Sequence, residues 1–309
     1  MRLRWLAILL IFGTLSAETI PVIVYQVKLA VQAGDLNLAK LEIKQFHTAM
    51  GARPEYAEAL SWLGRGELAQ KQYGLAEENA AEVRRLCLEA LPHRKLDADT
   101  SLPNALGASI EVQALVAVAQ GRRDQAVSFL RAEITRWTGT SIRPRIQKNL
   151  NLLTLEGKPA PPLETLHSVT MKKAQPLALH RGHPVLLFFW AHWCSDCKNE
   201  IQVIARLQKT YGKRGFEVIA PTQHFGYVAG GEDASPPVET RYIKTIFGQY
   251  YADLGSVETP LSEDNFARYG VSTTPTLVLV DAAGIVRVYN PGNLSYEQLA
   301  AKIEPLLKH

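Results

Sequence analysis

Two patterns of hydrophobic and polar positions divide the chain. From residue 18 to about residue 150, apolar side chains recur at spacings of three and four, among many Ala, Leu, Glu, Gln and Arg residues. This spacing predicts amphipathic helices. Further along, short apolar runs alternate with helical stretches, which predicts strands separated by helices in a layered sheet. We therefore expect an all-α domain at residues 18–150 and an α/β domain at residues 151–309, with the boundary between Leu150 and Thr154.

The helical region contains an irregular repeat. Segments beginning at Ala33, Lys71 and Gln120 each combine a turn, a short gap and a helix that opens with alanine; the shared alanines are Ala39, Ala76 and Ala126. The middle unit resembles the tetratricopeptide repeat, through Leu60, Leu63, Gly64, Tyr73 and Ala76. Small residues let paired helices pack closely in such repeats. We expect irregularly repeated helical hairpins, with a nonrepetitive helical bundle as the alternative.

Prolines separate this region from the second one. Pro159, Pro161 and Pro162 stop helix propagation and favour extended chain. The run "PVLLFFW" from Pro184 is apolar throughout, as expected for a strand covered on both faces. The further pattern predicts strands at 216–222, 276–280 and 285–289, and helices at 194–211, 238–251, 265–270 and 295–307.

The first seventeen residues have the pattern of a secretory signal peptide. Arg2 and Arg4 precede an apolar run from Trp5 to Leu15, and Ser16-Ala17 supply small residues for cleavage. The run is shorter than the roughly 20 residues that span a bilayer, although an uncleaved anchor is the alternative. We expect an exported, periplasmic protein, in a compartment where cysteine pairs can oxidise and persist.

Composition excludes several classes of protein. The hydrophobic content of 47% is that of a soluble globular chain. The formal charge of +4, without a basic tail or strip, gives no indication of nucleic-acid binding. Three cysteines are too few for a disulfide scaffold. Of these, Cys87 stands alone and is expected to be a buried apolar side chain.

The stretch "WAHWCSDCKNE" carries the candidate chemistry. Cys194 falls where a buried strand meets a helix start, a position that favours thiolate over thiol. Cys197 lies one turn further on the same face, placed to attack a mixed disulfide formed by Cys194. Such a pair carries two electrons by itself, so neither flavin, nicotinamide nor metal is required. A passive protein-binding scaffold is an alternative that needs neither thiol.

Metal binding is the other interpretation of the cysteine pair. Zinc would need four ligands, with His180 and His183 as the further candidates. The seven-residue strand between the two pairs would separate them by about 23 Å, which disfavours that site. Monovalent copper on the two thiolates, helped by His192 or His224, is the stronger alternative because this ion accepts soft sulfur ligands.

From about Glu156 to its end, the sequence resembles the thioredoxin superfamily, and within it the extracytoplasmic thiol-disulfide oxidoreductases of the TlpA/ResA type. The segments that carry the resemblance are "GKPAPPLE", "HPVLLFFWAHWC" and "TTPTLVLVDAAGIV". The resemblance implies a thioredoxin-like fold and a reductase of protein disulfides. It also implies reduction by a membrane electron-donor protein, and a cis peptide between Thr274 and Pro275 where substrate pairs.

Several site residues follow from this resemblance or depart from it. Trp193 is expected to cover the active edge and to contact the substrate. Asp196 stands where the family often has proline, and its charge would favour a reducing couple. Phe188 occupies the position of thioredoxin's buried acid, and Glu200 is expected to replace that acid as proton relay. We expect His192 at an exposed rim. The loop from His224 either shapes the substrate groove or is a tolerated insertion.

The two halves imply two kinds of partner. The cysteine pair implies protein disulfide substrates. The helical region is expected to form a groove that binds a protein or peptide.

Overall fold

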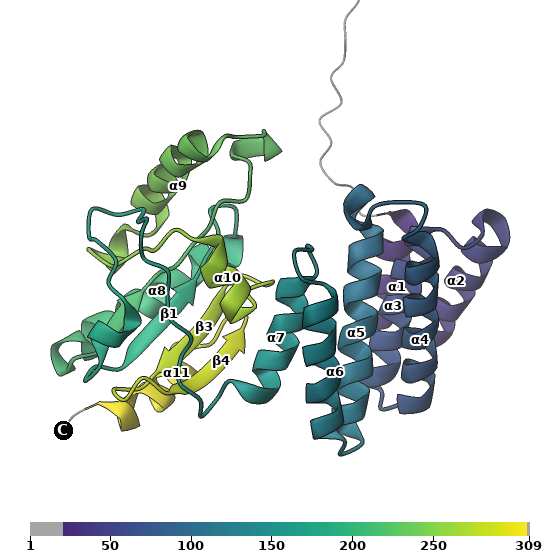
Figure 1. The fold of residues 1–309 in the computed structure, drawn as a ribbon, viewed down its shortest axis with the longest axis horizontal. Coiled ribbons are helices and arrows are strands. Elements are labelled where there is room, and N and C mark those ends of the chain that lie inside the picture. The colour runs from purple at the N-terminus through teal and green to yellow at the C-terminus, as the bar shows by residue number, and fades with distance from the viewer. Residues whose placement is uncertain (1–20, 308–309) are drawn as a thin grey trace, which may run out of the picture.

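The computed structural model describes residues 21–307 (Figure 1). The first half is helical, and its helices are α1 (Val22–Gln32), α2 (Leu36–Met50), α3 (Pro54–Ala69), α4 (Tyr73–Ala90), α5 (Ser101–Ala119), α6 (Arg123–Arg136) and α7 (Arg143–Thr154), with a short 3-10 helix η1 (Leu96–Ala98). The expected signal peptide at residues 1–17 lies outside the described residues.

The turns within the first three helix pairs are alike. Gly34, Lys71 and Gly121 each adopt a positive φ, near 61° to 78°. In each turn the next amide bonds the carbonyl five residues back, as from Asp35 to Ala30. The shared alanines Ala39, Ala76 and Ala126 are all fully buried. These features confirm hairpins whose second helix packs through a small residue.

The hairpins stack on one another. Each pair of helices is in contact, and the first helices of successive pairs also touch, α1 with α3 and α3 with α5. Helix α5 passes the length and composition test for a membrane span, but 61% of the tested window is buried inside the protein. It packs against α3, α4 and α6, which makes it the central helix of this half.

The second half is an α/β layered domain. Its strands are β1 (Val185–Phe189), β2 (Glu217–Ile219), β3 (Thr276–Val280) and β4 (Val286–Pro291), and its helices are α8 (Ser195–Tyr211), α9 (Pro236–Tyr250), α10 (Glu263–Tyr269) and α11 (Tyr296–Ile303). Short 3-10 helices are η2 (Leu177–His180), η3 (Gly212–Arg214), η4 (Ala229–Gly231), η5 (Ala252–Leu254) and η6 (Glu304–Leu306). The sheet order is β2-β1-β3-β4, with β1 and β2 parallel and the other pairs antiparallel.

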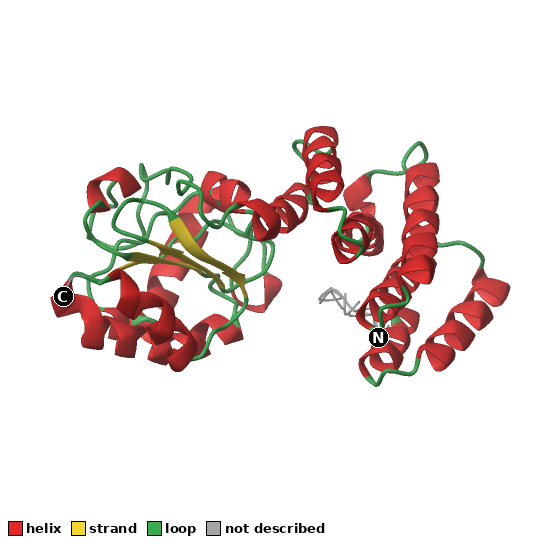
Figure 2. Cartoon of the chain, turned by 90° about the horizontal axis from the view of Figure 1, so that it is seen from below, coloured by secondary structure: helices red, strands yellow, loops and turns green. Residues whose placement is uncertain are grey.

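Both faces of this sheet are covered (Figure 2). Leu186 and Phe188 of β1 join a core with α8, α9 and α11, whereas the alternate residues of the same strand join a second core that includes α10. Alternation in a strand sends successive side chains to opposite faces, so an apolar run becomes a strand buried on both sides. This fold confirms the thioredoxin-like α/β class with a helical region before it.

The predicted elements match the structure with one shortened strand. The strand expected at 216–222 is reduced to β2, and on its other edge the chain makes only isolated parallel bridges, from Ile219, the last residue of β2, to Glu258 and from Thr222 to Leu261. Pro221 lies in this stretch and lacks the amide that a continuous ladder needs. The expected strand pair at 276–280 and 285–289 is the antiparallel pair β3–β4.

Helix α7 joins the two halves (Figure 1). It packs against α5 and α6 on one side and α10 on the other. Asn151 of α7 donates from Nδ2 to the carbonyl of Tyr269 at 2.9 Å. Gly270 adopts a φ of +64°, and a Cβ there would lie 2.4 Å from the backbone nitrogen of Lys148. Glycine at 270 therefore allows the close approach of the two backbones.

Candidate active site at the start of α8

Cys194 and Cys197 form a disulfide at the N-terminus of α8, with their Cα atoms 5.3 Å apart. Cys194 is the N-cap of the helix, and its sulfur accepts a hydrogen bond from the amide of Cys197 at 3.0 Å. Cys197 is fully buried and Cys194 nearly so. Free amides and the helix dipole at this position stabilise negative charge on the Cys194 sulfur once the pair is reduced.

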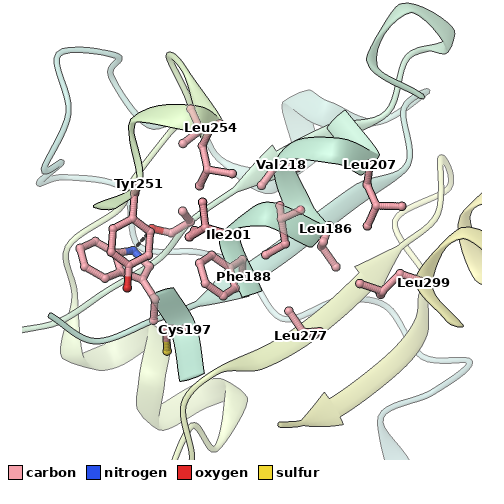
Figure 3. Close-up of a cluster of buried hydrophobic side chains, with 14 of the residues drawn as sticks. Leu186, Phe188, Cys197, Ile201, Leu207, Val218, Tyr251, Leu254, Leu277 and Leu299 are labelled. Atoms are coloured by element: carbon pink, nitrogen blue, oxygen red, sulfur yellow. Dashed lines mark hydrogen bonds between the residues drawn. The ribbon is translucent and has the colours of Figure 1, made fainter. Parts of the chain in front are cut away.

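Cys197 lies at the edge of the sheet's core (Figure 3). Phe188 of β1 and Tyr251, which follows α9, belong to the same cluster, and their ring centroids are 6.3 Å apart. Burial raises the pKa of Tyr251 well above its ordinary value of 10, so this hydroxyl stays neutral. Phe188 is fully buried in the same cluster as the two cysteines, so this cluster has an apolar side chain at the position that we match to thioredoxin's buried acid.

Glu200 is the buried carboxylate on the cysteine-bearing helix. It follows Cys197 by one turn of α8 and is 4% exposed, with one oxygen accepting the Leu294 amide at 3.3 Å. Burial raises the pKa of Glu200, and the Leu294 amide partly opposes this shift. The surroundings differ from those of a solvated surface glutamate, and they favour proton uptake at this position.

The peptide bond between Thr274 and Pro275 is cis, as the resemblance implied. Pro275 is buried and immediately precedes β3, the antiparallel neighbour of β1. The hydroxyl of Thr274 is buried and has no hydrogen-bond partner among the described residues.

Trp193 is the exposed aromatic side chain at the site, with 49% of its surface accessible. Its ring packs edge-on against Phe225, at 5.7 Å between centroids. Phe225 also packs edge-on against Phe266 of α10. The loop that begins near His224 therefore reaches the ring beside the nucleophile.

His192 lies in the interior, not at an exposed rim as expected. It is 2% exposed, and its Nε2 is 3.3 Å from Oε1 of Glu239, which is itself fully buried. Three rings surround the imidazole edge-on, with centroids 5.2 to 5.4 Å away, those of Phe225, Tyr227 and Tyr242. The prediction was wrong because Glu239 and these rings come from a distant segment.

Glu239 fixes the loop beside the site. Its two carboxylate oxygens accept the amides of Phe225, at 2.6 Å, and Gly226, at 2.9 Å. Burial lowers the pKa of His192, and the Glu239 carboxylate partly opposes this shift. Sequence reasoning missed this pair, because an acid in the first turn of a predicted helix is ordinary and the partners are 47 residues apart.

The histidines weighed as metal ligands have other partners. His180 contacts Glu217 at 2.5 Å, and His183 contacts the Gly215 carbonyl at 3.1 Å. Both precede β1, whereas the cysteines follow it. His224 bonds the Thr240 hydroxyl at 2.8 Å. Within residues 21–307, no group of three or more His, Cys, Asp or Glu side chains is arranged to hold a metal ion.

The third cysteine lies away from this site. Cys87 is fully buried in the helical half, on α4. Burial raises the pKa of its thiol to about 12, which keeps it protonated near neutrality.

Comparison with known proteins agrees with this geometry. A family model described as a thioredoxin-like domain matches residues 171–306. The thiol:disulfide interchange protein DsbE of Xylella fastidiosa is 30% identical over 156 residues, covering 50% of this chain and 70% of that protein. The thiol-disulfide oxidoreductase ResA of Geobacillus thermodenitrificans is 27% identical over 127 residues, covering 41% and 65%. The thioredoxin-like protein YneN of Bacillus subtilis is 26% identical over 152 residues, covering 48% and 79%. The chain therefore belongs to the thioredoxin-like family and is a thiol-disulfide oxidoreductase whose cysteine pair, Cys194 and Cys197, lies in its C-terminal half.

Proposed function

We propose that the protein reduces disulfides in other proteins, with Cys194 as the attacking thiol and Cys197 as the resolving thiol. The observation that carries this assignment is the capping position of Cys194, whose sulfur accepts the Cys197 amide at the start of α8. A sulfur at a helix N-terminus is stabilised as the thiolate, and the thiolate is the nucleophile in disulfide exchange.

The exchange has two steps. The Cys194 thiolate attacks one sulfur of the substrate disulfide, forming a mixed disulfide and releasing the other substrate sulfur as a thiolate that takes up a proton. Cys197 then loses its proton and attacks the Cys194 sulfur, which releases the second substrate thiol. The dithiol is oxidised to the Cys194–Cys197 disulfide, and its two electrons reduce the substrate.

Glu200 is the proposed proton relay for the second step. It stands one helical turn beyond Cys197, and burial raises its pKa. A carboxylate whose pKa is raised by burial can accept a proton from a thiol and return it. Because Phe188 of β1 is apolar, it cannot act as the proton relay. The candidate relay is therefore Glu200, the buried acid on the cysteine-bearing face of α8.

Trp193, Thr274 and Pro275 are the proposed substrate-binding residues. Trp193 is exposed beside the nucleophile and is backed by Phe225. Backbone near Thr274 precedes β3 and is available to pair with an extended substrate segment. Exposed backbone groups at a strand edge bind polypeptides by adding a strand.

The enzyme needs a reducing partner after each turnover. We propose a membrane thiol-disulfide protein as the electron donor, in an exported, periplasmic setting that the residue pattern at 1–17 supports. The division into a helical domain at 18–150 and a thioredoxin-like domain at 151–309 is likewise a proposal. The boundary falls within α7, which packs on both halves.

The direct test is a disulfide reduction assay with the wild type and the Cys194→Ser variant, together with the reduction potential of the pair. The account predicts turnover by the wild type, loss of turnover in Cys194→Ser, and a potential below about −200 mV. A potential well above that value would contradict the reducing direction. Full activity in Cys194→Ser would contradict the assignment of the nucleophile.

A further inference from the structure

A polar groove extends from the helical half to the loop before β3, which contains Ser272 and Thr273. Its volume is about 810 Å³, and α3, α5 and α7 contribute to its walls. Ser272 and Thr273 of the second half also line it. These two residues immediately precede Thr274 and the cis Pro275, so the groove ends within about 7 Å of chain from the proposed substrate-binding loop.

Glu58 of α3 presents an unused acceptor in this groove. It is 7% exposed, and its Oε1 accepts Asn104 Nδ2 at 3.1 Å. Its other oxygen, Oε2, is buried without a hydrogen bond in the described structure, although Ser101 lies close enough to lower the pKa. Burial is the larger effect and raises the pKa of Glu58. A buried carboxylate oxygen without a donor is costly, and a bound N–H group would remove that cost.

Arg65, two turns further along α3, presents an unused donor. Its Nε is buried without a hydrogen bond in the described structure, 3.7 Å from Glu111, and its guanidinium lies over Trp62. Glu111 is already bonded by Arg145 at 3.1 Å and Lys148 at 3.2 Å. Three cations therefore surround the Glu111 carboxylate, and the Nε of Arg65 remains a donor without a hydrogen bond in the described structure.

We propose that this groove binds the polypeptide chain of the disulfide substrate, on the segment next to the one that Cys194 attacks. The inference rests on the proposed function. A polypeptide supplies an N–H donor and a C=O acceptor at each residue, which matches an acceptor on Glu58 and a donor on Arg65 that each lack a hydrogen bond in the described structure. Because the groove reaches Thr273, a single extended substrate segment can lie along both halves.

Kinetics with substrates of two sizes test this binding. Scrambled ribonuclease A, an unfolded polypeptide with non-native disulfides, is long enough to occupy the groove, whereas oxidised glutathione is not. Glu58→Gln keeps the size of the side chain and an acceptor for Asn104 but replaces the unused acceptor with a donor. We expect KM for scrambled ribonuclease A to rise about tenfold, as for loss of a hydrogen bond to a charged group. KM for oxidised glutathione, kcat and the reduction potential should stay at wild-type values.

Two further variants complete the design. Asn104→Trp fills the groove from an exposed position and should raise the same KM. Glu67→Gln is the matched control, a buried glutamate of the same helix that pairs with Lys40 and Asn79 and does not line the groove. It should leave both KM values unchanged. Thermal melting checks that each variant is folded.

The outcomes separate this inference from the proposed function. Turnover of neither substrate by the wild type would overturn the proposed function itself. Turnover of both, with Glu58→Gln and Asn104→Trp changing neither KM or changing both KM values equally, would overturn the groove assignment and leave the thiol chemistry standing.

Discussion

The imidazole of His192, two residues before the nucleophile, lies 3.3 Å from the carboxylate of Glu239 on α9, and both side chains are buried. Glu239 also accepts the amides of Phe225 and Gly226. One buried pair thus connects the active-site segment to the loop that backs Trp193. The pair supports the shape of the site, while the cysteines provide its chemistry.

Replacing the imidazole should therefore cost stability. His192→Phe keeps an aromatic ring among Phe225, Tyr227 and Tyr242 but leaves Glu239 without one of its partners. We expect a loss of about 2–4 kcal/mol in the free energy of unfolding, as for one partner removed from a buried pair. Urea denaturation measures it. His224→Phe is the control at a half-buried histidine and should cost under about 1 kcal/mol; equal losses would contradict the special role of His192.

The pH dependence of stability should report the same residue. Burial lowers the pKa of His192 from its ordinary 6.5. Between the folded and unfolded pKa values the unfolded chain binds more protons, so stability falls as the pH falls below about 6.5. His192→Phe lacks this dependence. We expect the difference in unfolding free energy between wild type and His192→Phe to shrink from pH 7 to pH 5. A difference that stays constant would mean that His192 titrates normally.

Glu200→Gln should separate catalysis from stability. Burial raises the pKa of Glu200 above its ordinary 4.5, so the folded state binds more protons and stability falls as the pH rises through that window. The variant should therefore unfold at a higher temperature than wild type at pH 7, and this gain should vanish below about pH 4.5.

In the Glu200→Gln variant, the rate of mixed-disulfide resolution should fall about 100-fold, near the low end of general acid–base contributions. Stopped-flow kinetics of mixed-disulfide resolution measures it, with the exposed Glu263→Gln as control. A Glu200→Gln variant that resolves at the wild-type rate would remove Glu200 from the mechanism.

Gly270 should be essential for docking α7 onto the second half. Gly270→Ala places a Cβ within 2.4 Å of the Lys148 nitrogen and also strains a φ of +64°. We expect a loss of about 3 kcal/mol or more, because the strain of about 1–2 kcal/mol adds to a backbone clash. Gly230→Ala has a similar φ of +71° with no atom within 4 Å of the new Cβ, so it should show the strain alone. Equal losses in urea denaturation would mean that the contact with α7 contributes nothing.

Local pattern was enough to predict most of the fold. The apolar run at 184–190 predicted a strand buried on both faces, and β1 sends alternate side chains to two cores. The alanine positions of the repeated turns predicted helical hairpins, and Ala39, Ala76 and Ala126 are buried at their contacts. These features depend on residues close together in the chain, which is why periodicity reveals them.

Contacts between distant segments could not be predicted in this way. A lone histidine beside a tryptophan carries no sign of its partner, Glu239, so the sequence predicts a rim position for His192. The docking of α7 depends on Gly270, which in the sequence has the pattern of an ordinary glycine at a helix C-terminus. The groove with Glu58 and Arg65 likewise depends on how α3 lies beside the loop at Thr273. Such contacts are set by tertiary packing, and no spacing in the sequence encodes them.

The most direct test of the account is alkylation of the reduced protein by iodoacetamide across a pH series, with each cysteine followed by peptide mass spectrometry. The account predicts that Cys194 reacts first, with an apparent pKa below the roughly 8.5 of free cysteine. It also predicts that Cys197 reacts later and that the buried Cys87 reacts only after unfolding. A Cys194 that reacts no faster than Cys87 near neutrality would contradict the claim that an ionised Cys194 sulfur begins the exchange.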